Sequence, residues 1–194
     1  EDKKARILAE ALTLFSTRGY VGTSLADIAR ASDISKAGLL HHYSSKDQLL
    51  AAVLDERDRR TMSRLPGGDE GAEVALDAWV EMVAHNQRHP DGVALYTAMS
   101  AAVIDADHQA HPWFRQHLMS AIAYLVDALE RGKATGEVRA DAPSEQIARK
   151  LVALSDGLQV QWLCARVDGG GDVDMRGVTA GVVADVKDRW LVRS

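Results

Sequence analysis

The sequence contains a single cysteine, Cys164, four prolines and only 5% aromatic residues. One cysteine excludes an internal disulfide and a zinc-finger ligand set, and it fits the reducing cytoplasm, where we expect the protein to act. No hydrophobic run approaches the roughly 18 residues that a membrane-spanning helix requires, so we expect no membrane partner. The 194 residues, 46% hydrophobic and 26% charged, therefore have the ordinary composition of one globular domain or two small ones.

Charge is unevenly divided along the chain, although the net charge of −5 is modest. Residues 1–64 contain 11 Lys/Arg and 9 Asp/Glu, a balance of +2. Residues 65–194 contain the other 12 Lys/Arg and 19 Asp/Glu, a balance of −7. The sign of this difference favours the N-terminal segment as the place where an anionic partner would bind.

Hydrophobic residues recur with helical spacing in nearly every segment, and no segment shows the sustained alternation of a β-strand. Ser24 with Asp27, and Ser45 with Gln48, match the pattern of a capping box at a helix start. The sequence therefore predicts an all-α chain of about nine helices.

The clearest break in the helical pattern is the segment LPGGDEG over residues 65–71. We place a domain boundary there, between a first domain over 1–64 and a second over 65–194. A connecting helix over about 46–64 ends the first domain. The second domain is predicted to contain helices near residues 72–88, 91–105, 112–133, 143–166 and 174–192.

Two short predicted helices, over about 24–31 and 35–42, are joined by three or four residues, which is the pattern of a helix-turn-helix motif. Such a motif works because its second helix enters the major groove of DNA while neighbouring groups hold phosphates. The core that fixes the crossing of the two helices is expected to comprise Ile28, Ala29, Ile34, Leu39 and Leu40. The outward face of the second helix is expected to carry Lys36, Ala37, Gly38 and His41.

Residues 7–54, ILAEALTLFSTRGYVGTSLADIARASDISKAGLLHHYSSKDQLLAAVL, resemble the tetracycline-repressor (TetR) family of bacterial transcriptional regulators. The matching features, in order, are a Phe near the end of the first helix, Gly-Tyr, Thr-Ser, Asp-Ile-Ala, Ser-Lys, His-Tyr, and Ser-Lys-Asp before paired Leu. Weaker similarity continues over residues 96–163. The resemblance implies a homodimeric, ligand-responsive repressor that binds a palindromic double-stranded DNA operator and is released by a small-molecule effector. It implies neither an enzyme nor a cofactor.

Several residues are expected, by this resemblance, to contact DNA: Thr23, Ser24, Lys36, Ala37, Gly38, His41, His42, Tyr43 and Lys46. Lys36 and His41 match positions that reach bases or phosphates, whereas Tyr43 and Lys46 match positions that commonly hold phosphates. The alternative for His41 and His42 is a pair of solvated histidines at a helix end. Tyr43 could instead cap the small core with its ring, and Lys46 could be an ordinary surface lysine.

The predicted recognition helix lacks Arg, Asn and Gln, the residues that make the best bidentate contacts with bases. Base recognition is therefore expected to depend on Lys36, His41, apolar contacts, water and DNA shape.

A polar segment, residues 105–111, holds two aspartates and two histidines that could in principle bind a cation. The segment also lies at a predicted helix break before Pro112, where polar residues are expected in any case. We therefore expect no metal site. Adjacent His41 and His42 are not expected to bind metal either, because neighbouring side chains on a helix point about 100° apart.

Aromatic and flexible apolar residues of the second domain form a candidate effector pocket. Methionine suits such walls because its thioether adapts to varied ligands. The candidate lining residues are Trp79, Met82, Val83, Tyr96, Met99, Phe114, His117, Leu118 and Tyr124. The alternative for each of them is an ordinary place in the core.

The last two predicted helices carry apolar stripes and are candidates for a dimer interface. Gly157, Gly177 and Gly181 each cost about 1 kcal/mol of helix stability relative to Ala, and close approach of another helix would offset that cost. The candidate interface residues are Leu151, Leu154, Leu158, Trp162, Val178, Gly181, Val182 and Val186. The alternative is packing within one chain.

Two other functional classes compete with a DNA-binding regulator. A helical adaptor that binds only protein is the main alternative. An enzyme is disfavoured, because the sequence shows no Ser/His/Asp or Cys/His arrangement, no glycine-rich phosphate loop and no paired carboxylates in a recognisable context.

Overall fold

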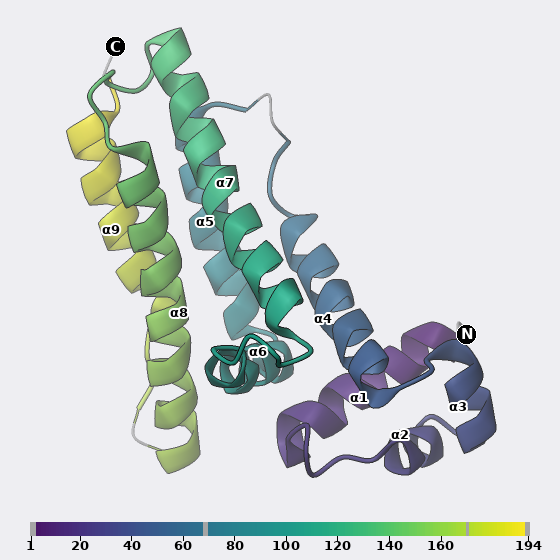
Figure 1. The fold of residues 1–194 in the computed structure, drawn as a ribbon. Helices are drawn as coiled ribbons and strands as arrows, with labels where there is room; N and C mark the ends of the chain where they lie inside the picture. Colours follow the sequence, from purple (N-terminus) through teal and green to yellow (C-terminus); the bar gives the residue numbers. More distant parts are fainter. Residues whose placement is uncertain (1–2, 68–69, 170, 193–194) are drawn as a thin grey trace. The chain divides into compact units, whose positions relative to one another are not determined.

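The computed structural model describes residues 3–67, 70–169 and 171–192, which form nine α-helices (Figure 1). The helices are α1 (Lys3–Arg18), α2 (Leu25–Ala31), α3 (Lys36–His42), α4 (Lys46–Met62), α5 (Ala72–Gln87), α6 (Pro90–Ala102), α7 (His111–Thr135), α8 (Ser144–Asp168) and α9 (Met175–Trp190). Among these residues the sole strand-like feature is an isolated antiparallel bridge between Val138 and Leu191. The predicted all-α class with about nine helices is confirmed.

Side-chain caps determine where α2 and α4 begin. Asp27 N donates to Ser24 Oγ at 3.2 Å, and Ser24 N donates to Asp27 Oδ2 at 3.1 Å, which completes the predicted capping box. Gln48 N likewise donates to Ser45 Oγ at 3.1 Å. The Gln48 side chain, however, accepts from Ser44 N rather than Ser45 N, so the second box is shifted by one residue.

The chain packs as two compact units. The first comprises the residues up to Arg60 together with His89–Phe114, and the second comprises Thr61–Arg88 together with the residues from Arg115 onward. The first unit therefore contains α6 in addition to α1–α4. The predicted linker includes Gly68 and Asp69, which lie outside the described residues, and a boundary at residue 65 stays a prediction.

One hydrophobic core holds the first unit together. Its buried residues come from α1 to α4 and the residue that closes α3, from α6, and from the start of α7 with the residue just before it. They are Ile7, Ala11, Phe15, Ile28, Ala29, Leu39, Tyr43, Leu49, Leu50, Val53, Leu54, Leu95, Tyr96, Met99, Ala110 and Phe114.

Polar and aromatic contacts attach α6 and the start of α7 to α4 within this unit. The Arg57 guanidinium lies 4.6 Å from the centroid of the Tyr96 ring. Tyr96 in turn stacks on Phe114 with ring centroids 5.0 Å apart. Trp113 Nε1 donates to Asp55 Oδ1 at 2.8 Å. These contacts hold α6 on α4, although the two helices are far apart in sequence, so α6 packs as part of the N-terminal unit.

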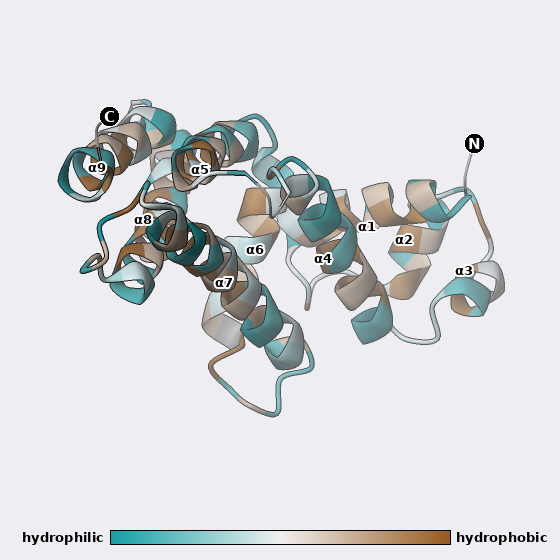
Figure 2. Ribbon diagram, turned by 90° about the horizontal axis from the view of Figure 1, so that it is seen from above, coloured by the Kyte–Doolittle hydropathy of each residue, from teal (hydrophilic) through white to brown (hydrophobic). Residues whose placement is uncertain are grey.

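In the second unit, α9 lies alongside both α5 and α8 (Figure 1). Its interior includes Trp79, which is 3% exposed and donates from Nε1 to Ser155 Oγ at 3.1 Å. The Ser155 hydroxyl donates to the Leu151 carbonyl at 2.9 Å, so both polar groups are satisfied inside the core. Hydrophobic and hydrophilic residues alternate along the ribbons, as expected for amphipathic helices (Figure 2).

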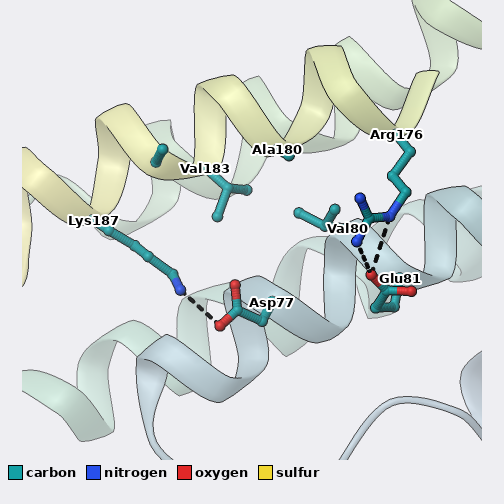
Figure 3. A pocket seen from close by; sticks show the side chains of 8 residues that line it. Asp77, Val80, Glu81, Arg176, Ala180, Val183 and Lys187 are labelled. Carbon is teal, nitrogen blue, oxygen red and sulfur yellow. Dashed lines mark hydrogen bonds and ion pairs between the residues drawn. The ribbon is translucent and has the colours of Figure 1, made fainter. Parts of the chain in front are cut away.

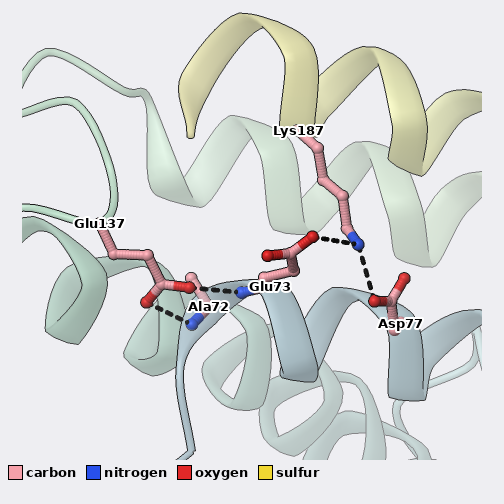
Figure 4. A network of polar contacts seen from close by, with 5 residues as sticks. All are labelled: Ala72, Glu73, Asp77, Glu137 and Lys187. Carbon is pink, nitrogen blue, oxygen red and sulfur yellow. Dashed lines mark hydrogen bonds and ion pairs between the residues drawn. The ribbon is translucent and has the colours of Figure 1, made fainter. Parts of the chain in front are cut away.

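A glutamate distant in sequence caps the start of α5 (Figure 4). The Glu137 carboxylate accepts from Ala72 N and from Glu73 N, each at 2.9 Å. Gly71, the residue before the helix, has no side chain, and a Cβ there would lie 2.9 Å from the same carboxylate. The carboxylate thus satisfies two N–H groups that the helix itself leaves without partners.

Candidate DNA-binding site

The second helix of the helix-turn-helix, α3, begins at a tight turn and a side-chain cap. Asp33 adopts a positive φ of 52°, a conformation that aspartate tolerates better than most residues. Ser35 then caps the helix, its Oγ accepting from Gly38 N at 3.0 Å. A Cβ at position 38 would lie only 3.2 Å from that oxygen, so glycine leaves room for the cap.

One face of α3 is open to solvent. Lys36, Ala37, Leu40 and His41 are all exposed, whereas Leu39 is fully buried in the core of the first unit. At 100° per residue, the four exposed positions fall within an arc of roughly 140° around the helix. This arc, defined by Lys36, Ala37, Leu40 and His41, is the recognition face.

The expected core of the motif is wrong at one residue, Leu40. Its side chain is 39% exposed, whereas Ile28, Ala29 and Leu39 are buried and Ile34 is partly buried against them. The signal that could have placed Leu40 was its spacing, because it lies four residues after Lys36 and so shares that residue's face.

The end of α3 and the start of α2 frame the recognition face. Tyr43 is 8% exposed, and its N–H donates to the Leu39 carbonyl at 2.9 Å, which closes α3. The His42 ring is half-buried and meets the His41 ring edge-on, with centroids 5.8 Å apart. Ser24 is exposed, although its hydroxyl and N–H both contact the Asp27 side chain.

Thr23 lies inside the unit and not on its surface. The side chain is 1% exposed, and Oγ1 lies 2.9 Å from the Gly19 carbonyl and 3.1 Å from the Leu14 carbonyl. Its N–H donates to the Tyr20 carbonyl at 3.4 Å. The hydroxyl therefore holds the turn before α2, and a phosphate contact by Thr23 stays a prediction.

Lys46, at the start of α4, is bound to the turn between α1 and α2. Its Nζ donates to the Tyr20 carbonyl at 2.9 Å and to the Thr23 carbonyl at 3.0 Å. The same atom lies 4.3 Å from the centroid of the Tyr20 ring. Two of its three N–H groups are thereby used within the protein.

Residues 7–53 match the model of the family described as bacterial regulatory proteins, tetR family. This DNA-binding segment belongs to the TetR family. Over 176 residues it is 27% identical to the HTH-type transcriptional repressor AcnR of Corynebacterium diphtheriae, with 89% of this chain and 84% of that protein covered.

Solved structures share the whole fold. A TetR transcriptional regulator from Chloroflexus aurantiacus superposes with a TM-score of 0.81 at 20% identity, covering 98% of this chain and 97% of that one. A protein from Saccharomonospora viridis, described as a transcriptional regulator and solved in complex with choline, gives a TM-score of 0.76 at 22% identity over 98% of both chains. At these identities the likeness shows the fold.

The candidate effector-pocket residues are divided between the two units of the chain. Tyr96, Met99 and Phe114 are buried in the core of the first unit. The other six belong to the second unit: Trp79, Met82, Val83, His117, Leu118 and Tyr124. Trp79, Met82 and Val83 are buried, and the buried Tyr124 hydroxyl has no hydrogen-bond partner among the described residues. The effector pocket stays a prediction.

The candidate dimer residues divide by exposure. Leu151, Leu158 and Trp162 are at most 4% exposed and pack inside the protomer. Leu154, Val182 and Val186 are half-buried, while Val178 and Gly181 are exposed. The stripe along α8 is therefore covered largely by the protomer's own residues.

A different face of α8 and α9 is open to solvent. Gly157 and Gly181 are exposed, and a Cβ at either position would meet no described atom beyond its own helix backbone within 4 Å. Val160 and Val178 are 48% and 45% exposed. We call this set, with exposed Ala153 and Cys164 on α8, the open face of α8 and α9.

A shallow groove of about 330 Å³ lies between α5 and α9 (Figure 3). Val80 and Val183 contribute its apolar surface. Arg176 bonds Glu81 at 2.6 Å, and Lys187 bonds Asp77 at 2.7 Å, so ion pairs join the two helices across it. These ion pairs satisfy the charges that line the groove, which fits a role in holding α9 on α5.

Within the described ranges, no group of three or more His, Cys, Asp or Glu side chains could hold a metal ion. In the segment 105–111 the rings bond locally instead: His108 Nδ1 accepts from Ala110 N at 3.2 Å, and His111 Nδ1 lies 2.7 Å from the Val103 carbonyl. No helix in the described part of the chain is long and apolar enough to cross a membrane.

Proposed function

We propose that this TetR-family protein is a homodimeric repressor that binds a palindromic DNA operator in the cytoplasm and is released by a small-molecule effector. The observation that carries the proposal is the recognition face, on which a lysine, a histidine and two apolar side chains stand exposed on a helix that the core holds in place. A second helix of this kind fits the major groove.

The recognition face divides into polar and apolar contacts with bases. Lys36 and His41 donate to acceptors at base edges, and Ala37 and Leu40 contact thymine methyl groups. Gly38 keeps the Ser35 cap intact at the helix start.

Phosphate contacts surround this face and set the position of the protein on the duplex. Ser24, His42 and the Tyr43 hydroxyl supply such contacts, and so does the charge of Lys46 at the N-terminus of α4. Thr23 is left out of this set, because its hydroxyl is buried.

The dimer forms through the open face of α8 and α9. Each glycine in a helix lowers its stability by about 1 kcal/mol relative to alanine, and no residue in the described part of the protomer comes close enough to require a glycine at position 157 or 181. Close approach of a second copy, which requires small residues at both positions, offsets the cost in helix stability. Two such protomers present two recognition helices to half-sites about 34 Å apart.

The effector binds in the C-terminal region and shifts the balance between a DNA-binding and a released arrangement. A ligand can do this only through different affinities for the two arrangements. The lever is α4, with α6 as a second element, because both share the core of the DNA-binding unit. That a regulator of this fold was solved with choline supports a small-molecule effector.

A fluorescence-anisotropy titration with DNA from beside its own gene tests this function. We expect sequence-preferring binding at moderate salt that competitor DNA of unrelated sequence does not abolish, and release when the correct metabolite is added. Binding that is equal for every DNA sequence would favour the alternative, a helical adaptor that recognises protein.

A further inference from the structure

The turn between α1 and α2 is fastened to the first turn of α4 by contacts that span 26 and 27 residues of sequence. Lys46 Nζ donates to the carbonyls of Tyr20 and Thr23, as described above. The Tyr20 hydroxyl donates to Asp47 Oδ1. The two contacts come from adjacent residues of α4 and reach the same short turn.

Tyr20 also connects this turn to the core. Its ring packs against Phe15, with centroids 5.5 Å apart, and Phe15 is 1% exposed. Burial, together with the hydrogen bond to Asp47, raises the pKa of the Tyr20 phenol well above its ordinary value. The phenol therefore remains a hydrogen-bond donor throughout the physiological pH range.

Asp47 needs an explanation if this end of α4 faces DNA. A carboxylate beside Lys46 repels phosphates and opposes the binding that the lysine favours. A structural use for the carboxylate resolves this conflict, and its bond with Tyr20 provides one.

We propose that Tyr20 and Asp47 are positioning residues for DNA binding, which act with Lys46 to hold the starts of α2 and α4 as one body. Neither Tyr20 nor Asp47 touches DNA. They fix the position of Ser24, which follows the bound Thr23 carbonyl in sequence, relative to Lys46. Ser24 and Lys46 can then contact the same DNA backbone. This inference rests on the proposed DNA-binding function.

Three variants separate positioning from simple electrostatics. Tyr20→Phe removes the hydroxyl without changing charge, and we expect about tenfold weaker operator binding, as for the loss of a hydrogen bond to a charged group. Asp47→Ala removes a negative charge and the acceptor together. Electrostatics alone predicts tighter binding by Asp47→Ala, whereas positioning predicts weaker binding.

Asp47→Asn is the matched control, because it has the same charge as Asp47→Ala but keeps an oxygen that accepts from the Tyr20 hydroxyl. We expect Asp47→Asn to bind DNA more tightly than Asp47→Ala. Equal affinities for these two variants, or an affinity of Tyr20→Phe equal to that of the parent, would overturn the assignment.

Hydrogen exchange without DNA tests the same contacts independently of function. We expect backbone amides of residues 19–25 and 46–50 to exchange faster in Tyr20→Phe and Asp47→Ala than in the parent, while α8 stays unchanged. Unchanged exchange in both segments would contradict the inference even if DNA binds. Faster exchange in a chain that binds no operator would instead count against the proposed function alone.

Discussion

At the scale of single residues, the recognition face combines two polar side chains, Lys36 and His41, with the apolar pair Ala37 and Leu40. A helix with this composition has few ways to choose bases. Hydrogen-bond donors at its ends distinguish acceptors in the major groove, and apolar side chains distinguish thymine by its methyl group. Substitutions of the polar and of the apolar residues should therefore change DNA recognition in different ways.

Leu40→Ala should abolish the contribution that a thymine methyl group makes to the affinity for the operator. When thymines of the operator are replaced one at a time by deoxyuridine, we expect the parent to lose roughly fourfold in affinity at the position of each half-site that Leu40 contacts, because burying a methyl group contributes about 0.8 kcal/mol. The variant should bind both DNAs equally. If the variant kept the full sensitivity to deoxyuridine, Leu40 would not make this contact.

Lys36→Ala should change base preference instead of affinity alone. We expect a selection from random DNA to return a site in which one position per half-site has lost its preference, since a good base contact discriminates by about 1–3 kcal/mol. The control is Lys3→Ala, an exposed lysine at the start of α1 outside the motif. An identical selected site for Lys36→Ala and the parent would exclude the proposed role.

Sequence patterns located this surface but did not assign every residue on it. The capping pattern of Ser24 and Asp27 depends on local geometry alone, and it was correct. Leu40 was wrongly placed in the core because an apolar residue next to Leu39 looks like a core residue whichever way it points. Thr23 was predicted to contact DNA, whereas its burial depends on carbonyls of the preceding turn, which no local pattern shows.

At the scale of elements, helix starts are secured both by neighbours and by distant residues. The cap of α2 comes from three residues away, whereas the cap of α5 comes from Glu137, 65 residues away from Ala72. The first kind of cap is visible in the sequence. The second kind, like the packing of α6 with α1, follows from tertiary structure and could not be predicted from periodicity.

Glu137→Ala should destabilise the second unit. Loss of a cap typically lowers the free energy of unfolding by about 1 kcal/mol, and here the carboxylate serves two N–H groups, so we expect about 1–2 kcal/mol. Urea unfolding followed by circular dichroism measures the change. The control is Glu145→Ala, which removes an exposed ion pair with Arg149 and should have a much smaller effect. Equal losses in the two variants would contradict the capping role.

In the whole molecule, recognition of a palindromic operator requires two copies acting together. The apolar stripe of α8 predicted burial, but a stripe does not show whether its own chain or a second copy covers it. Leu151, Leu158 and Trp162 are buried by residues of the same protomer, whereas Gly157 and Gly181 are exposed. The proposed interface therefore lies on a different face of α8, far around the helix from the buried stripe.

Gly157→Arg should produce a folded monomer. Arginine is a better helix former than glycine, and a Cβ at position 157 would meet no other described atom within 4 Å, so helix content should be kept while close approach of a second copy is blocked. Sedimentation velocity at micromolar concentration measures the result. Met119→Arg, which places the same residue at an exposed position of α7, should leave a dimer. A dimer in both variants would show that the interface does not include the surface around Gly157.

Selection from random DNA shows whether two copies of α3 bind one symmetric DNA site. We expect a single palindromic sequence whose half-sites lie about one helical turn, or roughly 34 Å, apart, bound by at least one dimer. A half-turn insertion between the half-sites should abolish specific binding. Recovery of no preferred sequence, or of a lone half-site bound by one chain, would exclude a dimer that recognises a palindromic operator.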